Sequence, residues 1–111
     1  ERRLAAFLAD LESSEGVRIE TRRLARFEPV RFDAALARRI GEVAARLGHS
    51  HRRMTSGAGH DAQMLARVCP AAMIFVPSVR GISHNPAEHT EPAHLEAGAN
   101  VLLQVLLELA A

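Results

Sequence analysis

Several residue types are missing from this chain of 111 residues. It has no tryptophan, no tyrosine and only four phenylalanines, so it lacks the aromatic side chains on which nucleic-acid bases stack. Lysine is also absent, and the 14 basic residues, all arginine, are nearly balanced by 13 acidic ones to give a net charge of +1. Because nucleic-acid-binding proteins carry a clear positive footprint, we expect no nucleic-acid partner.

Cysteine and long apolar runs are scarce as well. The single cysteine, Cys69, excludes an internal disulfide and fits a reducing compartment, so we expect a cytoplasmic protein. No apolar run reaches the roughly 20 residues that cross a bilayer, so we expect no membrane partner. The first residue is Glu1 rather than methionine, which is compatible with an excised piece of a longer protein.

The N-terminal third contains one helix pattern and one strand pattern. Apolar residues at i, i+3, i+4 and i+7 predict an amphipathic helix, which Gly16 ends: Leu4, Phe7, Leu8 and Leu11. Residues 17–24 then alternate between apolar and charged side chains, which predicts a half-buried strand.

From Asp33 onward, helix patterns alternate with strand patterns. Asp33 is placed to cap a helix that ends at Gly48 and carries one apolar stripe: Leu36, Ile40, Val43, Ala44 and Leu47. A short strand (51–55) and a short helix (60–69) follow. Residues 71–78 form an apolar run, typical of a strand with Ile74 and Phe75 buried on opposite faces. Thr90 is placed to cap a last helix with an apolar side: Leu95, Gly98, Val101, Leu102, Val105, Leu106 and Leu109.

This alternation predicts an α/β fold, with a mixed or parallel sheet flanked by helices. The first 32 residues differ from the rest, so we place a boundary near Phe32 and treat 1–32 and 33–111 as separate parts.

Histidine 84 is the first candidate site residue. It follows the predicted 71–78 strand in a glycine-containing loop, and ligands of α/β sheets lie beyond the C-terminal ends of strands. A neutral imidazole there can bind a metal ion. The alternative is a solvated loop histidine.

The second candidate is the stretch SGAGHDA, residues 56–62. Gly57 and Gly59 allow a ligand to approach the backbone closely, and His60 can exchange a hydrogen bond in a cleft. Asp61 has a structural alternative, because an aspartate at a helix start caps free N–H groups. His60 too has one, since it can brace the loop.

Taken together, three stretches resemble the hydantoinase/carbamoylase amidohydrolases of the M20-like metallopeptidase superfamily: SGAGHDAQML, AAMIFVPSVRGISHNPAEHT and LEAGANVLLQVLLELA. This group includes N-carbamoyl-L-amino acid hydrolases, allantoate amidohydrolases and β-ureidopropionases. The resemblance covers nearly the whole chain and is strongest from Phe32 onward. The pairing of SGAGHDA with GISH at this separation is specific to the group.

The resemblance implies a hydrolase that acts on a small carbamoyl or ureido substrate. It also implies a homodimer and a site of two divalent metal ions, zinc or manganese, with cobalt or nickel as possible substitutes. The histidine of the GISH motif, here His84, would be a metal ligand. The loop that lines the cleft would comprise Ser56, Gly57, Ala58, Gly59, His60 and Asp61.

The resemblance also implies that much of the site lies elsewhere. The family's general base and other metal ligands lie upstream, so no catalytic residue is expected in this chain, which should be inactive alone. Residues 1–32 would end a lid and dimerisation domain, and 33–111 would be the C-terminal part of the catalytic domain. A non-catalytic association fragment or degenerate paralogue is the alternative, and an aminopeptidase of the same superfamily is a more distant one.

Overall fold

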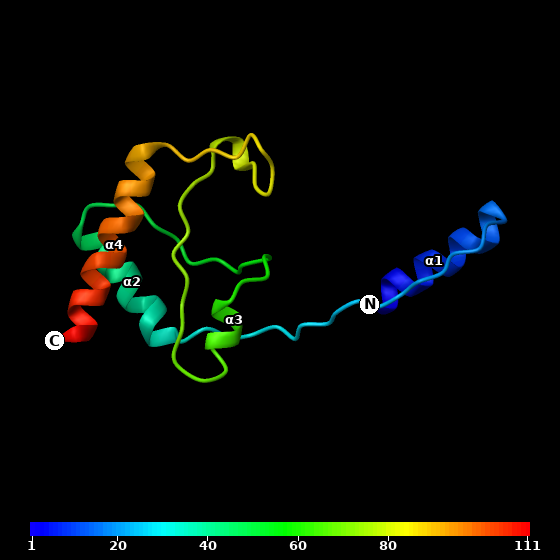
Figure 1. Ribbon diagram of the computed structural model, residues 1–111, viewed down its shortest axis with the longest axis horizontal. Helices are drawn as coiled ribbons and strands as arrows, with labels where there is room; N and C mark the ends of the chain where they lie inside the picture. Colours follow the sequence, from blue (N-terminus) through cyan, green and yellow to red (C-terminus); the bar gives the residue numbers. More distant parts are fainter.

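The computed structural model describes residues 1–111 as a helical body with a separate N-terminal arm (Figure 1). Its elements are α1 (Arg2–Glu15), α2 (Ala34–Arg46), α3 (Ala62–Leu65), the 3-10 helix η1 (Val79–Gly81) and α4 (Pro92–Ala110). The body contains all of these except α1. The radius of gyration, 19.5 Å, exceeds the value of about 13 Å expected for a compact chain of this length. The chain is therefore elongated, with extents of 62 × 34 × 20 Å.

The predicted α/β fold is wrong for this structure, because no residue forms a strand and no sheet is present. The three segments expected as strands, 17–24, 51–55 and 71–78, are not helical either. No backbone–backbone hydrogen bond involves residues 17–32, 50–59 or 72–77. A strand exists only when a neighbouring strand lies about 4.7–4.9 Å away to complete its hydrogen bonds, and none of these segments has one in this chain.

Helix α2 forms as its sequence predicts. The Asp33 carboxylate accepts a hydrogen bond from the Leu36 amide at 2.7 Å, which satisfies one of the free N–H groups of the first turn. Gly48 lies just beyond the last turn with φ of 77°, a left-handed conformation that glycine adopts without strain. Both predicted ends of this helix are confirmed.

Helix α4 packs across α2 and makes the largest helix contact of the body (Figure 1). It begins at Pro92 with no side-chain cap, so the predicted capping role of Thr90 is wrong. Arg46 of α2 forms an ion pair with Glu108 of α4 near the end of the contact. None of the helices combines the length and apolarity needed to cross a membrane.

The core between these two helices is small. Its buried members are Val43 and Ala44 of α2 with Val101 and Val105 of α4, and Ile74 packs against them from the 71–78 segment. The predicted two-face burial of that segment is wrong, because Phe75 is 50% exposed. The rest of the predicted apolar side of α4 borders a groove.

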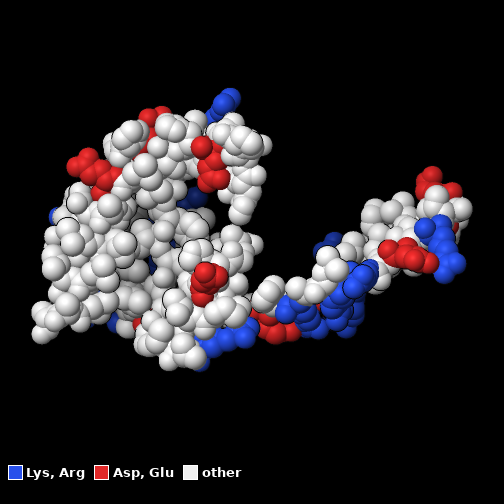
Figure 2. Space-filling model, viewed as in Figure 1, with Lys and Arg blue, Asp and Glu red and all other residues white.

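The N-terminal arm consists of α1 and the extended residues that follow it. Gly16 ends α1 in a left-handed conformation (φ 63°), as predicted. Arg23 and Arg26 lie 3.4 and 3.8 Å from the Glu1 carboxylate, so the extended segment runs back along the helix. Figure 2 shows charged side chains crowded on this segment and sparse on the visible face of the body. Two apolar side chains of α1 remain uncovered, Leu4 at 60% and Phe7 at 58% exposed, whereas Leu8 and Leu11 are half-buried.

Candidate functional site

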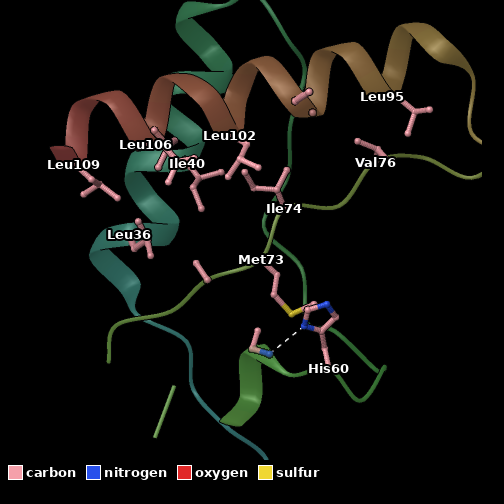
Figure 3. Close-up of a pocket in the computed structure, with 15 residues that line it drawn as sticks. Leu36, Ile40, His60, Met73, Ile74, Val76, Leu95, Leu102, Leu106 and Leu109 are labelled. Atoms are coloured by element: carbon pink, nitrogen blue, oxygen red, sulfur yellow. Dashed lines mark hydrogen bonds between the residues drawn. The ribbon is translucent and has the colours of Figure 1, made fainter. Parts of the chain in front are cut away.

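His60 begins the short helix α3 by a reciprocal pair of hydrogen bonds. Its ring Nδ1 accepts from the Ala62 amide at 3.0 Å, drawn as the dashed line in Figure 3. Its own amide donates to Oε1 of Gln63 at 3.4 Å. This pair resembles a capping box, but the His60 ring accepts from the amide two residues on rather than three, and His60 lies one residue before the N-cap residue, Asp61. The sequence analysis missed Gln63, although its spacing of three residues from His60 is the signal of such a box.

The hydrogen bond from Ala62 selects the tautomer of a neutral His60 ring. A nitrogen that accepts an amide proton must present a lone pair, so Nδ1 is unprotonated. In the neutral ring the proton then resides on Nε2. His60 therefore offers a hydrogen-bond donor at Nε2, where a metal ligand would need a lone pair.

The other hydrogen bonds of the 56–61 loop join residues close to one another in the sequence. The Ser56 hydroxyl accepts from the Ala58 amide at 3.2 Å and so forms a local turn. A Cβ added at Gly57 or Gly59 would meet no atom within 4 Å, so the space beside both residues is open. Asp61 is the N-cap residue of α3, but its side chain is exposed and makes no capping hydrogen bond, so the capping alternative for Asp61 is wrong. The His60 ring instead accepts from the first amide of the helix.

His84 lies at the tip of a second loop, residues 78–89, which we term the His84 loop. The loop is closed at its base, where the Val79 amide donates to the His89 carbonyl oxygen at 2.8 Å. His84 is exposed and adopts a left-handed backbone conformation (φ 54°), which is uncommon for a residue with a Cβ. Its amide donates to Glu88 Oε2 at 2.8 Å.

The two candidate loops are separate structures in this chain. No hydrogen bond or ion pair joins the 56–61 loop to the His84 loop. Figure 1 shows both on the side of the body that faces α1, with the His84 loop (yellow) above the 56–61 loop (green). Nowhere do three or more histidine, cysteine or acidic side chains gather as metal ligands would.

The donor set of the chain fits a metal ion only in part. The His84 imidazole is exposed and makes no hydrogen bond within the chain, so its nitrogens are available. A neutral imidazole is a good ligand for zinc, and it also binds cobalt and nickel. One imidazole can thus supply one ligand, and a metal site needs further ligands from other residues.

An apolar groove of about 450 Å³ lies beside the 56–61 loop. Figure 3 shows it between α4, α2 and the 71–78 segment, with Met73 and His60 at one end. Thirteen of its 15 lining residues are hydrophobic, so the His60 ring is a rare polar group in this wall. The groove is held narrow at Gly98, where an added Cβ would lie 2.5 Å from Val76 Cγ1.

Comparison with known proteins places this chain in a family. The model of the peptidase family M20/M25/M40 matches residues 9–108, so the chain belongs to that family. This confirms the resemblance drawn from the SGAGHDA and GISH motifs.

Several similar proteins are named as amidohydrolases or as members of the hydantoinase/carbamoylase family. Over 107 residues the chain is 41% identical to an allantoate amidohydrolase from Bacillus subtilis, covering 96% of this chain and 26% of the relative. It is 43% identical over 95 residues to an N-carbamoyl-L-amino-acid amidohydrolase from Rhizobium meliloti, covering 86% and 23%. A crystal structure of a hydantoinase/carbamoylase family amidase from Burkholderia vietnamiensis superimposes with a TM-score of 0.81 at 43% identity, covering 95% of this chain and 25% of that one. The chain thus spans about a quarter of the length of these relatives.

Proposed function

We propose that this chain is part of a metal-dependent amidohydrolase that hydrolyses the linear C–N bond of N-carbamoyl amino acids or related ureido compounds. The observation that carries this proposal is the 41–43% identity to relatives named for that chemistry, which extends over 86–96% of the chain. The exposure of both candidate loops supports it, because neither loop is consumed by packing within the chain.

In this proposal His84 supplies one imidazole ligand to a site of two divalent ions, zinc or manganese. Bound divalent ions lower the pKa of a water molecule and polarise the carbonyl oxygen of an amide. The other ligands and the general base belong to the part of the relatives that this chain does not span. The 111-residue chain alone is therefore inactive.

The 56–61 loop lines the substrate cleft in this proposal. His60 donates from Nε2 to the carbamoyl or ureido oxygen, because its Nδ1 is already engaged by the Ala62 amide. The open space beside Gly57 and Gly59 lets the substrate approach the backbone. The Ala62 amide holds the ring that carries this donor, and Gln63 holds the His60 backbone.

Residues 1–32 belong, in this proposal, to a lid and dimerisation domain, and residues 33–111 to the catalytic domain of a homodimer. The uncovered apolar face of α1 supports this assignment, with Leu4 60% and Phe7 58% exposed. Phe7→Glu in the full-length protein should convert the dimer to a monomer in analytical ultracentrifugation, while Arg2→Glu, on the opposite side of the same helix, should not.

The test of function is a substrate panel. The full-length protein should hydrolyse at least one of N-carbamoyl amino acids, allantoate and 3-ureidopropionate, lose this activity on dialysis against a chelator, and regain it with zinc or manganese. An aminopeptidase activity on dipeptides, with none on the ureido panel, would reject the proposal. Full activity after complete metal removal would reject its metal dependence.

A further inference from the structure

At the tip of the His84 loop, the side chain that holds the His84 backbone is that of Glu88. The Glu88 carboxylate accepts from the His84 amide through Oε2 at 2.8 Å. The Glu88 amide in turn donates to the Asn85 carbonyl oxygen at 2.9 Å, and Asn85 Oδ1 accepts from the Ala87 amide at 2.9 Å. Glu88 is thus tied to the loop by its backbone and reaches back to His84 with its side chain.

The hydrogen bond from His84 to Glu88 stabilises a backbone conformation of His84 that is unfavourable by itself. A residue with a Cβ pays a steric penalty at positive φ, and it stays there only when its surroundings fix it. His84 has φ of 54°. The hydrogen bond from its backbone amide to the Glu88 carboxylate is charge-assisted. No arginine pairs with Glu88, so nothing in the chain competes for the carboxylate.

The base of the same loop is fixed by other groups. The Ser78 hydroxyl donates to the carbonyl oxygens of Ile82 and His89, and the Val79 amide donates to His89. These bonds hold the ends of the loop together whether or not Glu88 is present. Loss of the Glu88 side chain should therefore free the tip without opening the base.

We infer that Glu88 is a positioning residue: it fixes the direction in which the His84 imidazole leaves the backbone, and so prepares that ring to bind the metal ion. The inference rests on the proposed role of His84 as a metal ligand. The structure gives Glu88 an acceptor's role, and a neutral glutamine can fill that role through its own side-chain oxygen. A glutamate that bound the metal ion directly could not be replaced in this way.

The experiment compares Glu88→Gln, Glu88→Ala and the control Glu96→Ala in the full-length enzyme, with Zn²⁺ titration of the metal-free protein. Glu96 is an exposed residue of α4 whose side chain makes no hydrogen bond or ion pair. Glu88→Ala should raise the Zn²⁺ dissociation constant about 10- to 100-fold, as loss of a group that orients a ligand does. The dissociation constant of Glu88→Gln should stay within about threefold of the wild-type value, and that of Glu96→Ala should equal the wild-type value.

A second measurement needs neither metal nor activity. Hydrogen exchange of the metal-free protein, followed by mass spectrometry over residues 80–91, should be faster in Glu88→Ala and nearly unchanged in Glu88→Gln. Wild-type Zn²⁺ affinity in Glu88→Ala would overturn the inference, whether or not its thermal stability falls. An equal loss of affinity in Glu88→Gln and Glu88→Ala would also overturn it, because Glu88 would then act through its charge.

His84→Ala separates this inference from the one beneath it. If His84→Ala retains the full metal content, the proposed role of His84 fails and the inference about Glu88 falls with it. If His84→Ala loses metal while Glu88→Ala does not, only the inference about Glu88 fails.

Discussion

The close approach of α4 to the 71–78 segment at Gly98 predicts an unusual effect of Gly98→Ala. In an exposed helix, replacing glycine by alanine stabilises the helix by about 1 kcal/mol. Here the added Cβ would lie 2.5 Å from Val76 Cγ1, more than 1 Å inside the ordinary contact distance of about 3.5–4.0 Å. Overpacking of this kind costs about 1–3 kcal/mol. We therefore expect Gly98→Ala to destabilise the chain by about 1 kcal/mol net.

The sign of this effect should reverse when the opposing atom is removed. Val76→Ala deletes Cγ1, so Gly98→Ala in that background should stabilise the chain by up to about 1 kcal/mol. Asn100→Ala, an exposed position two residues further along α4, measures the helix-propensity gain alone. Urea denaturation followed by far-ultraviolet circular dichroism gives the free energies of unfolding of the wild type, the two single variants, their double variant and Asn100→Ala. Stabilisation by Gly98→Ala in both backgrounds would refute the close contact.

Two further stability predictions follow from the core and the helix cap. Val43→Ala removes two methyl groups from a fully buried side chain and should lower the free energy of unfolding by about 1–3 kcal/mol. Phe75→Ala removes more atoms, but from a side chain that is 50% exposed, so it should cost less. The reverse order in urea denaturation would show that the core lies elsewhere. Asp33→Ala should lower the free energy of unfolding by about 1 kcal/mol, because the Leu36 amide loses its acceptor. Asp33→Ser keeps an acceptor and should lose much less stability. Equal losses in both variants would show that the cap is not what stabilises α2.

Local signals in the sequence predicted α1, α2 and α4 well, whereas the helix expected over 60–69 is only the four residues of α3. The apolar period and the capping residues Asp33, Gly16 and Gly48 act within a few residues of each other, so they are legible without knowledge of the rest of the chain. The cap of α4 was misplaced because Thr90 and Glu91 are both plausible starts before Pro92, and neither side chain makes the bond.

The strands were not predictable in the same way. An apolar or alternating pattern specifies an extended backbone, but a strand also requires a partner at hydrogen-bonding distance, which lies outside the local sequence. Residues 72–77 are apolar and not helical, and their backbone groups have no hydrogen-bonding partner among these 111 residues. The half-exposed Phe75 has the same origin, because its second face has nothing to pack against.

The site roles of His60 and His84 stay predictions, and only the placement of these residues in the chain is visible in the structure. The motifs singled out His60 and His84, and the structure places both in exposed loops. The sequence did not reveal that the His60 ring caps α3 or that Glu88 holds the His84 backbone, because both depend on loop conformations that no periodicity encodes.

The most direct test of the central claim is the metal content of His84→Ala in the full-length enzyme, with His94→Ala as the control. His94 is an exposed histidine of α4 whose ring makes no hydrogen bond or ion pair. Elemental analysis after gel filtration should show that His84→Ala has lost bound zinc or manganese, and assays on the ureido panel should show that most activity is gone, with the circular dichroism spectrum unchanged. His94→Ala should retain both metal and activity. Full metal content and full activity in His84→Ala would contradict the account.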